Sequence, residues 1–545
     1  MDNLFVPTPD QQAAIDSNAN MVITACPGSG KTSVVVQKIR KEIPEIRDHR
    51  GVLGITFTVK ASKELKRKCK KDGFNTKRSF FGTIDHFCLS EIIFPFAKRV
   101  WGGSGDSRLE CIAYDELDEG LKANLPPLND VGTVLSTNDY NQYENEFIQH
   151  YRSGFILLEA VGILANHILN NSIACQRYIT ARYTSLYVDE YQDSSQAQHK
   201  SFLSLLKLGL RAVAVGDVQQ SIYAWRGSSP DYINELVSQP DVFEHHIVNI
   251  NHRCHPSITN YANRLFSENA NLLPANEIRV FHRVFNGTQI DLANELNTYL
   301  PKAAALYGVT NLSEIAILVR NNRSLGYLTA GLNIPHRVYS DDSLGLINTR
   351  ASNLFSDLLR YRYDTAFLTT DIDAVREYES VCTRAQLARV RSGIQLVRSI
   401  DDQYLEATIL DISEELLGGN LSSRDVAALN DVVNSTEALN QYTPSNDTEV
   451  QVMTLHKSKG LEFEIVFHLD LYDWVFPYRE YTGDFNDEVY PSWDQDLNLH
   501  YVGITRAKAA CILARSTRRL NNQQQNKQGR NSAFLELNGL GGLHA

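Results

Sequence analysis

The stretch Met21-Val-Ile-Thr-Ala25-Cys-Pro-Gly28-Ser-Gly30-Lys31-Thr32 decides the fold of this chain. A short apolar run, rich in β-formers, is followed at once by a turn with two glycines. A Lys-Thr pair then opens a helical pattern. Strand, glycine-rich turn and helix in this order indicate a P-loop, in which backbone N–H groups point at phosphates. The stretch therefore predicts a nucleotide site at the end of a strand in an α/β fold.

The residue types within this turn fit phosphate chemistry. Gly28, Ser29 and Gly30 allow the backbone to approach the phosphates closely. We expect Lys31 to reach the β- and γ-phosphate oxygens, and the Thr32 hydroxyl to bind Mg²⁺. Ala instead of Gly at the first position of the usual pattern does not disturb the order of strand, loop and helix. The predicted ligands are thus a nucleoside triphosphate and Mg²⁺.

A second segment, Leu186-Tyr-Val-Asp189-Glu190, is an apolar strand that ends in two carboxylates. Such a pair alone is more often a solvated strand end, but a P-loop upstream makes a catalytic pair the better interpretation. We expect Asp189 to hold Mg²⁺ through water and Glu190 to polarise the attacking water. Together the two segments predict an enzyme that hydrolyses a nucleoside triphosphate.

The composition is that of a globular protein of several domains. The chain has 545 residues, is 43% hydrophobic and carries a net charge of −11, so any contact with nucleic acid must come from a local patch. The eight cysteines have no C-x-x-C spacing, which favours reduced thiols over a disulfide frame or a metal cluster. Because no run of ~18 apolar residues occurs, we expect a soluble, cytoplasmic protein without membrane contact.

Strand-like runs alternate with helical stretches along the chain, which predicts parallel sheets. The predicted strands are Met21–Thr24, Val52–Phe57, Leu186–Val188, Ala212–Val215, Ile247–Ile250, Ile315–Val319, Val450–Thr454, Ile465–Leu469 and Ala510–Ala514. We expect an α/β fold of two P-loop-type domains, each with a helical insertion. The first domain would cover residues 1–87 and 181–235 around an insertion at 88–180. The second would cover 236–340 and 446–545 around a reduced insertion at 341–445.

Four longer segments resemble those of the UvrD/Rep/PcrA-like DNA helicases of superfamily 1, whose two domains are RecA-like. They are Asp189-Glu-Tyr-Gln-Asp-Ser194, Gly216-Asp-Val-Gln-Gln220-Ser-Ile-Tyr-Ala-Trp225-Arg-Gly227, Thr454-Leu-His-Lys-Ser-Lys-Gly460-Leu-Glu-Phe463 and Tyr501-Val-Gly-Ile-Thr-Arg506-Ala-Lys508. Their order matches the family, and the resemblance extends over almost the whole chain. It implies an ATP-dependent DNA helicase or translocase.

The resemblance also implies roles for further residues at the nucleotide. Gln11 matches the adenine-reading glutamine, and an amide can serve both N6 and N7 of adenine. Gln220 matches a γ-phosphate sensor. Arg253 and Arg506 match arginines that reach the γ-phosphate from the second domain, and such a finger raises rates ~10³–10⁵-fold in other NTPases. The resemblance further implies nucleotide contacts by Gly460 and by Glu462, the latter at the ribose. Ser33 and His252 also stand at positions that contact the nucleotide in the family, but both differ from the residues usually found there. In the family, hydrolysis changes how far the two domains close, which moves the strand.

On the nucleic-acid side the resemblance implies stacking and phosphate contacts. The implied residues are Phe57, Thr83, Tyr223, Trp225, Arg226 and His456. Aromatic faces stack single-strand bases without reading sequence. An isolated aromatic would more often be core packing, but the Trp-Arg-Gly context favours stacking for Trp225. The run from Lys60 to Lys71 contains six Lys and one Arg. It either lines the channel for the DNA strand or forms a solvated helix face.

Two functions of different kinds fit these observations. The first is a self-sufficient helicase that moves from 3′ to 5′ on single-stranded DNA and acts at duplex junctions. The second is an ATPase or DNA-sensing subunit, because the compact chain also resembles the helicase-like subunit of Gabija-type anti-phage systems, which works with an OLD-family nuclease. The short second insertion and the absence of a visible nuclease motif are compatible with both. A P-loop protein without nucleic acid would leave Trp225 and Arg226 unexplained.

Overall fold

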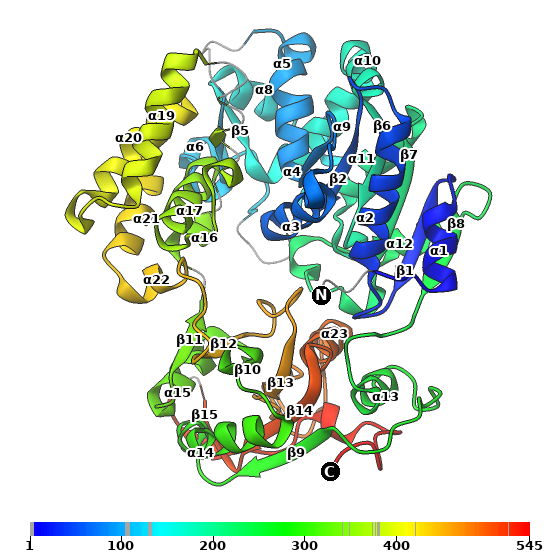
Figure 1. The fold of residues 1–545 in the computed structure, drawn as a ribbon, viewed down its shortest axis with the longest axis vertical. Helices are drawn as coiled ribbons and strands as arrows, with labels where there is room; N and C mark the ends of the chain where they lie inside the picture. Colours follow the sequence, from blue (N-terminus) through cyan, green and yellow to red (C-terminus); the bar gives the residue numbers. More distant parts are fainter. Residues whose placement is uncertain are drawn as a thin grey trace. The chain divides into compact units, whose positions relative to one another are not determined.

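The structure is a computed structural model that describes residues 5–103, 109–128, 133–340, 342–347, 349–372, 374–375, 378, 382–419, 421–521 and 523–545. The chain divides into two compact units. The first comprises Met1–Glu277, Pro477–Thr505 and Asn538–Leu540, and the second comprises Ile278–Phe476, Arg506–Leu537 and Gly541–Ala545. Each unit is built on one six-stranded parallel sheet (Figure 1).

The sheet of the first unit has the strand order β3-β2-β6-β7-β1-β8 and is parallel throughout. Its strands are β1 Met21–Ala25, β2 Gly51–Thr56, β3 Phe80–Thr83, β6 Tyr183–Val188, β7 Arg211–Gly216 and β8 Glu244–Val248. Because all strands run the same way, their carboxyl ends lie along one edge of the sheet. In doubly wound sheets this edge is where ligands bind.

Helices cover both faces of this sheet, since successive strand residues point to opposite sides. One face packs against α1 Pro9–Asp16, α2 Lys31–Glu42 and α3 Val59–Lys70, and Met21 and Ile23 point to it. The other face, to which Val22 points, packs against α9 Val161–Asn171, α11 Gln196–Lys207 and α12 Asp231–Val237. Because helices cover both faces, the side chains of a central strand are buried on either side, and these strands are therefore continuous apolar runs.

The first insertion is mostly helical, as predicted. It contains a π-helix at Cys88–Ile93, α5 Phe94–Trp101, α6 Glu119–Lys122, α7 Asp139–Gln142, α8 Glu144–Arg152 and α10 Ile173–Arg182, with the parallel strands β4 Glu110–Ile112 and β5 Phe155–Leu157. Its apolar side chains continue the core beneath α9 and α11, so the insertion and the sheet share one core. The short helix α4 Ile84–Phe87 leads from β3 into it.

The sheet of the second unit has the order β11-β12-β10-β13-β14-β9 and is also parallel. Its strands are β9 Val280–Phe285, β10 Ile315–Val319, β11 His336–Tyr339, β12 Val450–Thr454, β13 Phe463–His468 and β14 Ala507–Ser516. Two helices, α14 Gln289–Tyr307 and α15 Asn322–Gly331, cover one of its faces. A short antiparallel hairpin follows β14, formed by β15 Arg518–Leu520 and β16 Asn526–Gln528.

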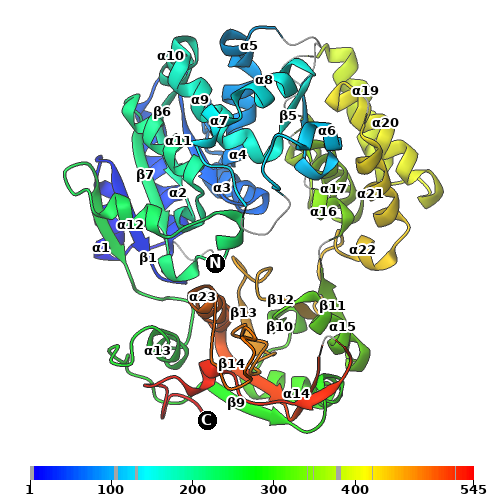
Figure 2. The same cartoon turned by 180° about the vertical axis from the view of Figure 1, so that it is seen from behind.

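The second insertion is a helical bundle with its own apolar core. Its helices are α16 Ser343–Ile347, α17 Arg350–Tyr363, α19 Arg384–Val397, α20 Leu405–Leu417, α21 Ser423–Val433 and α22 Thr436–Asn440 (Figure 2). The two parallel α/β sheets and the helical insertions that the sequence predicts are therefore confirmed. Within the described residues, no helix combines the length and the apolar composition needed to cross a membrane.

The structure draws the boundaries between the two units differently from the sequence prediction. The strand predicted at Ile247–Ile250 is β8 at Glu244–Val248, and it pairs with β1 in the first sheet although the second domain was expected to begin at residue 236. The segment Pro477–Thr505, with α23 Trp493–Ile504, also belongs to the first unit. The reason is local: α23 donates side-chain hydrogen bonds to the segment after β7.

Candidate nucleotide and nucleic-acid site

The predicted functional residues of the first unit gather at the carboxyl edge of its sheet. The P-loop follows β1, Phe57 follows β2, and Asp189 follows β6. The residues from Asp217 to Arg226 follow β7. Since neighbouring parallel strands end side by side, segments far apart in the sequence meet here. The placement of the chemistry is thus a consequence of the strand order.

The P-loop has the geometry of an anion site. Gly28 and Gly30 adopt positive φ of 69° and 75°, which glycine tolerates without steric cost. Helix α2 begins at Lys31 without a side-chain cap, so its first N–H groups point outward from a positive helix end. The Ser29 hydroxyl oxygen is buried and has no hydrogen-bond partner within the described part of the chain. The residues present therefore fit a bound triphosphate.

Lys31 is the cation at the centre of an acidic cluster. Its Nζ lies 2.8 Å from Oε1 of Glu190. Burial is the largest influence on the pKa of Lys31 and lowers it, but the carboxylates of Glu190, Asp189 and Asp217 together outweigh it and raise that pKa. The ammonium group is thus held charged in a buried position, where its field acts at low dielectric.

The two carboxylates at the end of β6 have different neighbours. Oδ2 of Asp189 accepts a hydrogen bond of 2.9 Å from the Thr32 hydroxyl. The pKa of Asp189 is raised to about 6, first by burial and then by Glu190, against the lowering effects of Lys31 and Thr32. Glu190 has a positive φ of 60°, which is unusual outside glycine and concentrates at functional sites. A hard cation suits this oxygen-rich set of donors.

Sequence reasoning did not single out two residues that complete this cluster. Gln192 donates to Oε2 of Glu190 at 2.6 Å, and its own Oε1 accepts from the backbone N–H of Asp217 at 3.0 Å. Asp217 is buried, which raises its pKa, and Nε2 of the predicted sensor Gln220 donates to its Oδ2 at 2.5 Å. Both residues stood within the motifs, but only the fold reveals that their side chains turn inward.

The turn after β8 lies directly against the P-loop. The backbone N–H of His252 donates to the Gly28 carbonyl at 3.1 Å. Oδ1 of Asn251 accepts from the backbone N–H groups of Arg253 and Cys254 at 2.8 and 3.0 Å, which fixes the turn. Arg253 was expected to approach from the second domain, but it belongs to the first unit because β8 does. Asn251 is a further residue that the motifs did not reveal.

Replacing Gly28 by Ala is expected to disrupt this contact. A Cβ at Gly28 would lie 2.5 Å from Cβ of Arg253 and 2.6 Å from Oδ1 of Asn251, at a φ of 69°. Gly73 has a similar φ of 74° and no described atom within 4 Å of such a Cβ. Gly73→Ala therefore carries the same conformational cost, and Gly28→Ala should destabilise the first unit by a further ~1–3 kcal/mol. Thermal unfolding of both variants measures this, and equal midpoints would contradict the contact.

Gln11 lies beside the P-loop, as the resemblance implies, but its amide is already engaged. Nε2 donates to the Ser29 carbonyl at 2.7 Å, and Oε1 accepts from the backbone N–H of Thr8 at 2.8 Å. It therefore ties α1 to the P-loop, with one amide hydrogen left to donate. Ser33 is half-buried in the first turn of α2, and the side chain of His252 is exposed.

Aromatic residues form a second cluster at the same edge. The rings of Phe57 and Tyr223 stack with centroids 5.3 Å apart. The Arg226 guanidinium lies 4.5 Å from the ring centroid of Trp225, which is 43% exposed, and 5.5 Å from that of Tyr223. A large exposed indole beside a cation is a platform for stacking and for a phosphate, unlike a core aromatic. Thr83 ends β3 opposite Thr56 and caps α4 by accepting from the backbone N–H of His86 at 3.3 Å.

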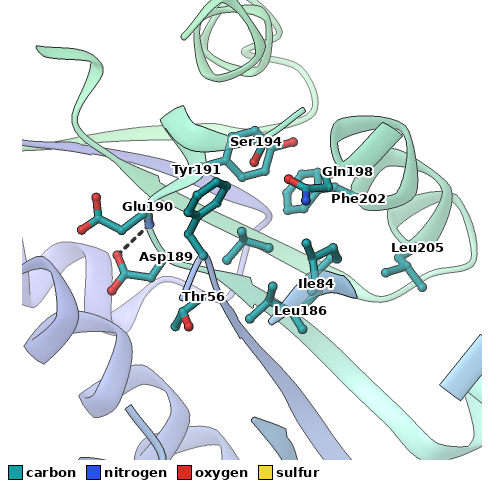
Figure 3. A pocket seen from close by; sticks show the side chains of 13 residues that line it. Thr56, Ile84, Leu186, Asp189, Glu190, Tyr191, Ser194, Gln198, Phe202 and Leu205 are labelled. Carbon is teal, nitrogen blue, oxygen red and sulfur yellow. Dashed lines mark hydrogen bonds between the residues drawn. The ribbon is translucent and has the colours of Figure 1, made fainter. Parts of the chain in front are cut away.

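A small cavity lies between the acidic strand end and helix α11 (Figure 3). Asp189 and Glu190 lie at one end of it, and Phe202 and Leu205 line the other. Its volume of about 20 Å³ holds one or two water molecules and excludes a nucleotide base. A cavity of this volume is not a nucleotide site.

The remaining predicted residues lie in the second unit. Gly460 has a φ of 84° in the turn after β12, where His456 is half-buried. Glu462 lies 3.4 Å from Nζ of Lys508, and Arg506, only 1% exposed, donates to the Leu461 carbonyl at 3.1 Å. His456 follows β12 at the carboxyl end of the second sheet, whereas Glu462 and Arg506 directly precede β13 and β14 at its amino end.

Two amide side chains of α23 contact the segment after β7. Asn498 donates from its Nδ2 to the Ser221 carbonyl at 2.9 Å. Gln495 donates to the Ile222 carbonyl at 3.1 Å in the same way. Both amides therefore support the segment that leads from Gln220 to the aromatic cluster.

Comparison with known proteins gives matches along most of the chain. The N-terminal domain of the UvrD/REP helicases matches residues 7–100 and 122–241, and the UvrD-like helicase C-terminal domain matches residues 349–517. The chain is 27% identical to the Gabija protein GajB of Bacillus cereus, over 92% of this chain and 94% of that protein. It is 24% identical to the ATP-dependent DNA helicase Rep of Escherichia coli, over 92% and 89%. Identity to PcrA of Bacillus subtilis is 22%, over 93% and 82%.

The P-loop faces an acidic strand end on the first parallel sheet, and the chain contains a second parallel sheet. This arrangement is that of P-loop NTPases with two α/β domains. The helicase domains matched at both ends of the chain make this class specific. The chain belongs to the UvrD-like helicase family, an enzyme family of ATP-dependent DNA helicases.

Proposed function

We propose that this chain hydrolyses ATP at the P-loop and uses the energy to move along single-stranded DNA, in the 3′-to-5′ direction that the family resemblance implies. One observation carries the proposal: the acidic Lys31 cluster and the Phe57–Tyr223 stack occupy the same edge of one sheet. Glu190 and Phe57 directly follow neighbouring, paired strands. A conformational change that accompanies hydrolysis at the phosphates can therefore reach the bound DNA strand through a few residues.

The nucleotide side of the proposal assigns each group a task. Lys31 binds the β- and γ-phosphates, and Glu190 orients the attacking water and takes its proton. Thr32 and Asp189 hold Mg²⁺, which when bound supplies charge neutralisation at those phosphates. Gln220 is the proposed γ-phosphate sensor. Its amide donates to Asp217, whose charge acts on Lys31, and the chain leads from Gln220 directly into the aromatic segment.

Two arginines are proposed to act on the charge that develops during hydrolysis. Arg253 is supported by its packing on Gly28, which keeps it at the P-loop. The Nη1 of Arg253 donates a hydrogen bond of 3.3 Å to the carbonyl of Thr505, the residue that precedes Arg506 in the sequence. Arg506, Gly460 and Glu462 remain proposed nucleotide contacts on the family resemblance. Coupling of hydrolysis to domain closure stays a prediction.

The nucleic-acid side is proposed to bind by stacking and charge. Trp225, Tyr223 and Phe57 offer faces to bases, and Arg226 pairs with a phosphate. Thr83 and His456 complete the contacts that the resemblance implies. The exposure of Trp225 supports this assignment, since a core tryptophan would be buried.

A second candidate function is an ATPase or DNA-sensing subunit of a Gabija-type anti-phage assembly with a nuclease partner, which the sequence resemblance gives as OLD-family. The specific observation in its favour is the similarity to the Gabija protein GajB along nearly the full length of both chains. That alignment spans 513 residues, whereas those with Rep and PcrA spread over 614 and 619. The chain thus shares the compact form of the Gabija protein.

Hydrolysis of ATP by the purified chain, with and without single-stranded DNA, tests the proposed function. We expect strong stimulation by the single strand, because both clusters share one sheet edge. Unwinding of duplexes with a 3′ or a 5′ tail in the same buffer then separates the candidates. Unwinding from the 3′ tail supports a self-sufficient helicase, and stimulation without unwinding supports the subunit. A chain that hydrolyses ATP without any response to DNA at low salt would contradict both.

A further inference from the structure

Helix α3 carries a row of cations that the nucleotide and stacking sites do not use. From Lys60 to its end at Lys70 it holds five Lys and one Arg against one acidic residue, in a chain whose net charge is −11. The one acid, Glu64, is paired with Lys68 at 2.7 Å. Such a local concentration of positive charge in an acidic protein creates a field of its own.

The cations lie on the side of α3 that faces away from the core. Ser62, Leu65 and Cys69 are the buried residues of the helix, and they pack toward β2 and β3. At ~100° per residue the opposite side carries positions spaced three, four and three apart. These positions are Lys60, Lys63, Arg67 and Lys70, which we call the α3 stripe. Lys60, Arg67 and Lys70 are exposed, and Lys63 is half-buried.

Helix stability explains only part of the α3 stripe. Cations stabilise the C-terminal turn of a helix through the macrodipole but destabilise its N-terminal turn. Lys60 stands in the first turn of α3, directly after the cap that Thr58 forms with the N–H of Ala61. Arg67 and Lys70 lie in the favourable last turn, so the macrodipole accounts for those two cations but not for Lys60, whose position fits a ligand with negative charge.

The stripe starts at the aromatic cluster. Phe57, whose ring stacks on Tyr223, precedes the cap of α3 by one residue. From Lys60 to Lys70 the helix rises ~15 Å, which exceeds the spacing of neighbouring phosphates along a strand. A strand with one base on the Phe57 platform can therefore run its backbone along the stripe. An acidic protein would use the cations but leave the adjacent stacking platform without a role.

We propose that the α3 stripe binds the phosphate backbone of the single strand whose bases stack at Phe57 and Trp225, and that it supplies a large part of the salt-dependent affinity. This inference rests on the proposed function, because it extends the same strand site. It assigns α3 to binding through charge alone, without base recognition.

The test is the salt dependence of binding of a short fluorescein-labelled oligo(dT) strand, followed by anisotropy, for the Lys60→Gln, Arg67→Gln, Lys70→Gln triple variant. Each lost phosphate contact lowers the slope of log K against log salt by ~0.7 for single strands. We expect a slope smaller by about 2 and binding weaker by roughly 100-fold at ~0.1 M salt. The Lys60→Arg, Lys70→Arg variant should keep the wild-type slope.

Two controls make the outcome specific. The Arg177→Gln, Lys200→Gln, Lys207→Gln variant removes three exposed cations from α10 and α11 of the same unit and should keep the slope. Trp225→Ala should weaken binding at every salt concentration without changing the slope, since stacking releases no counterions. Circular dichroism of the triple variant should match the wild type, because Gln and Lys have similar helix propensity.

Two results would overturn the proposal. A triple variant that binds with the wild-type slope, while the wild-type chain binds oligo(dT), refutes the α3 stripe alone and leaves the proposed function intact. The stripe would then face another polyanion, such as an acidic protein. A wild-type chain that does not bind oligo(dT) at low salt refutes the stripe together with the proposed function.

Discussion

Replacing Lys31 by Ala is expected to abolish ATP hydrolysis, with a loss in kcat of ~10³-fold or more, because it removes the cation aimed at the transferred phosphate. Lys31 lies 2.8 Å from Glu190, and its charge also stabilises Asp189 and Asp217. Without it, the buried carboxylates of Asp189 and Asp217 lose the charge that lowers their pKa values, and those pKa values rise further. Release of inorganic phosphate by the purified variant, with single-stranded DNA present, measures the effect.

The matched control lies on the same helix. Lys41 is ten residues further along α2, is exposed, and pairs with Asp16 at 2.7 Å. Surface pairs of this kind contribute little, so Lys41→Ala should hydrolyse ATP at nearly the wild-type rate. A Lys31→Ala variant that retains more than about a tenth of the wild-type rate would mean that the P-loop is not the site of hydrolysis.

Replacing Glu190 by Gln is expected to stop hydrolysis while ATP remains bound. The amide has almost the same shape, but it cannot accept the proton of the attacking water, which costs ~10²–10⁴-fold in rate. Lys31 loses its closest counter-charge at 2.8 Å, yet Asp189 and Asp217 still neutralise it. Binding of a fluorescent ATP analogue and phosphate release under single-turnover conditions measure the two effects separately.

Glu235→Gln is the control for this substitution. Glu235 lies in α12 of the same unit, and its Oε2 is 3.3 Å from Nε2 of His199, away from the P-loop. This variant should hydrolyse ATP at the wild-type rate. Hydrolysis by Glu190→Gln within threefold of the wild type would assign the water-orienting role to another carboxylate of the cluster, such as Asp217.

The central strands of both sheets could be predicted from the sequence because they are continuous apolar runs. β10 and β12 lie at the predicted residues, and β1, β2, β6, β7, β13 and β14 overlap them closely. Strands buried on both faces by helices need apolar side chains at every position, which makes them visible in one dimension.

Within the two six-stranded sheets, the strands that were missed or displaced are the edge strands. β3 and β8 bound the first sheet, and β11 and β9 bound the second. Edge strands keep part of their surface in solvent and carry polar residues, as in His282 and Arg283 of β9, so no apolar run marks them. The displacement of β8 explains why the first unit was predicted to end too early.

The sequence by itself determined the P-loop with Lys31 and Thr32, the carboxylates Asp189 and Glu190 at a strand end, and the Trp225-Arg226 pair that we propose contacts single-stranded DNA. These depend on residue type and local spacing, which a chain carries in order. Only the tertiary structure decided that Asp217 faces Lys31, that Asn251 holds the turn at the P-loop, and that the α3 stripe begins beside the stacked aromatics. Such contacts join segments whose nearness depends on strand order, because parallel strands bring their ends together regardless of distance along the chain.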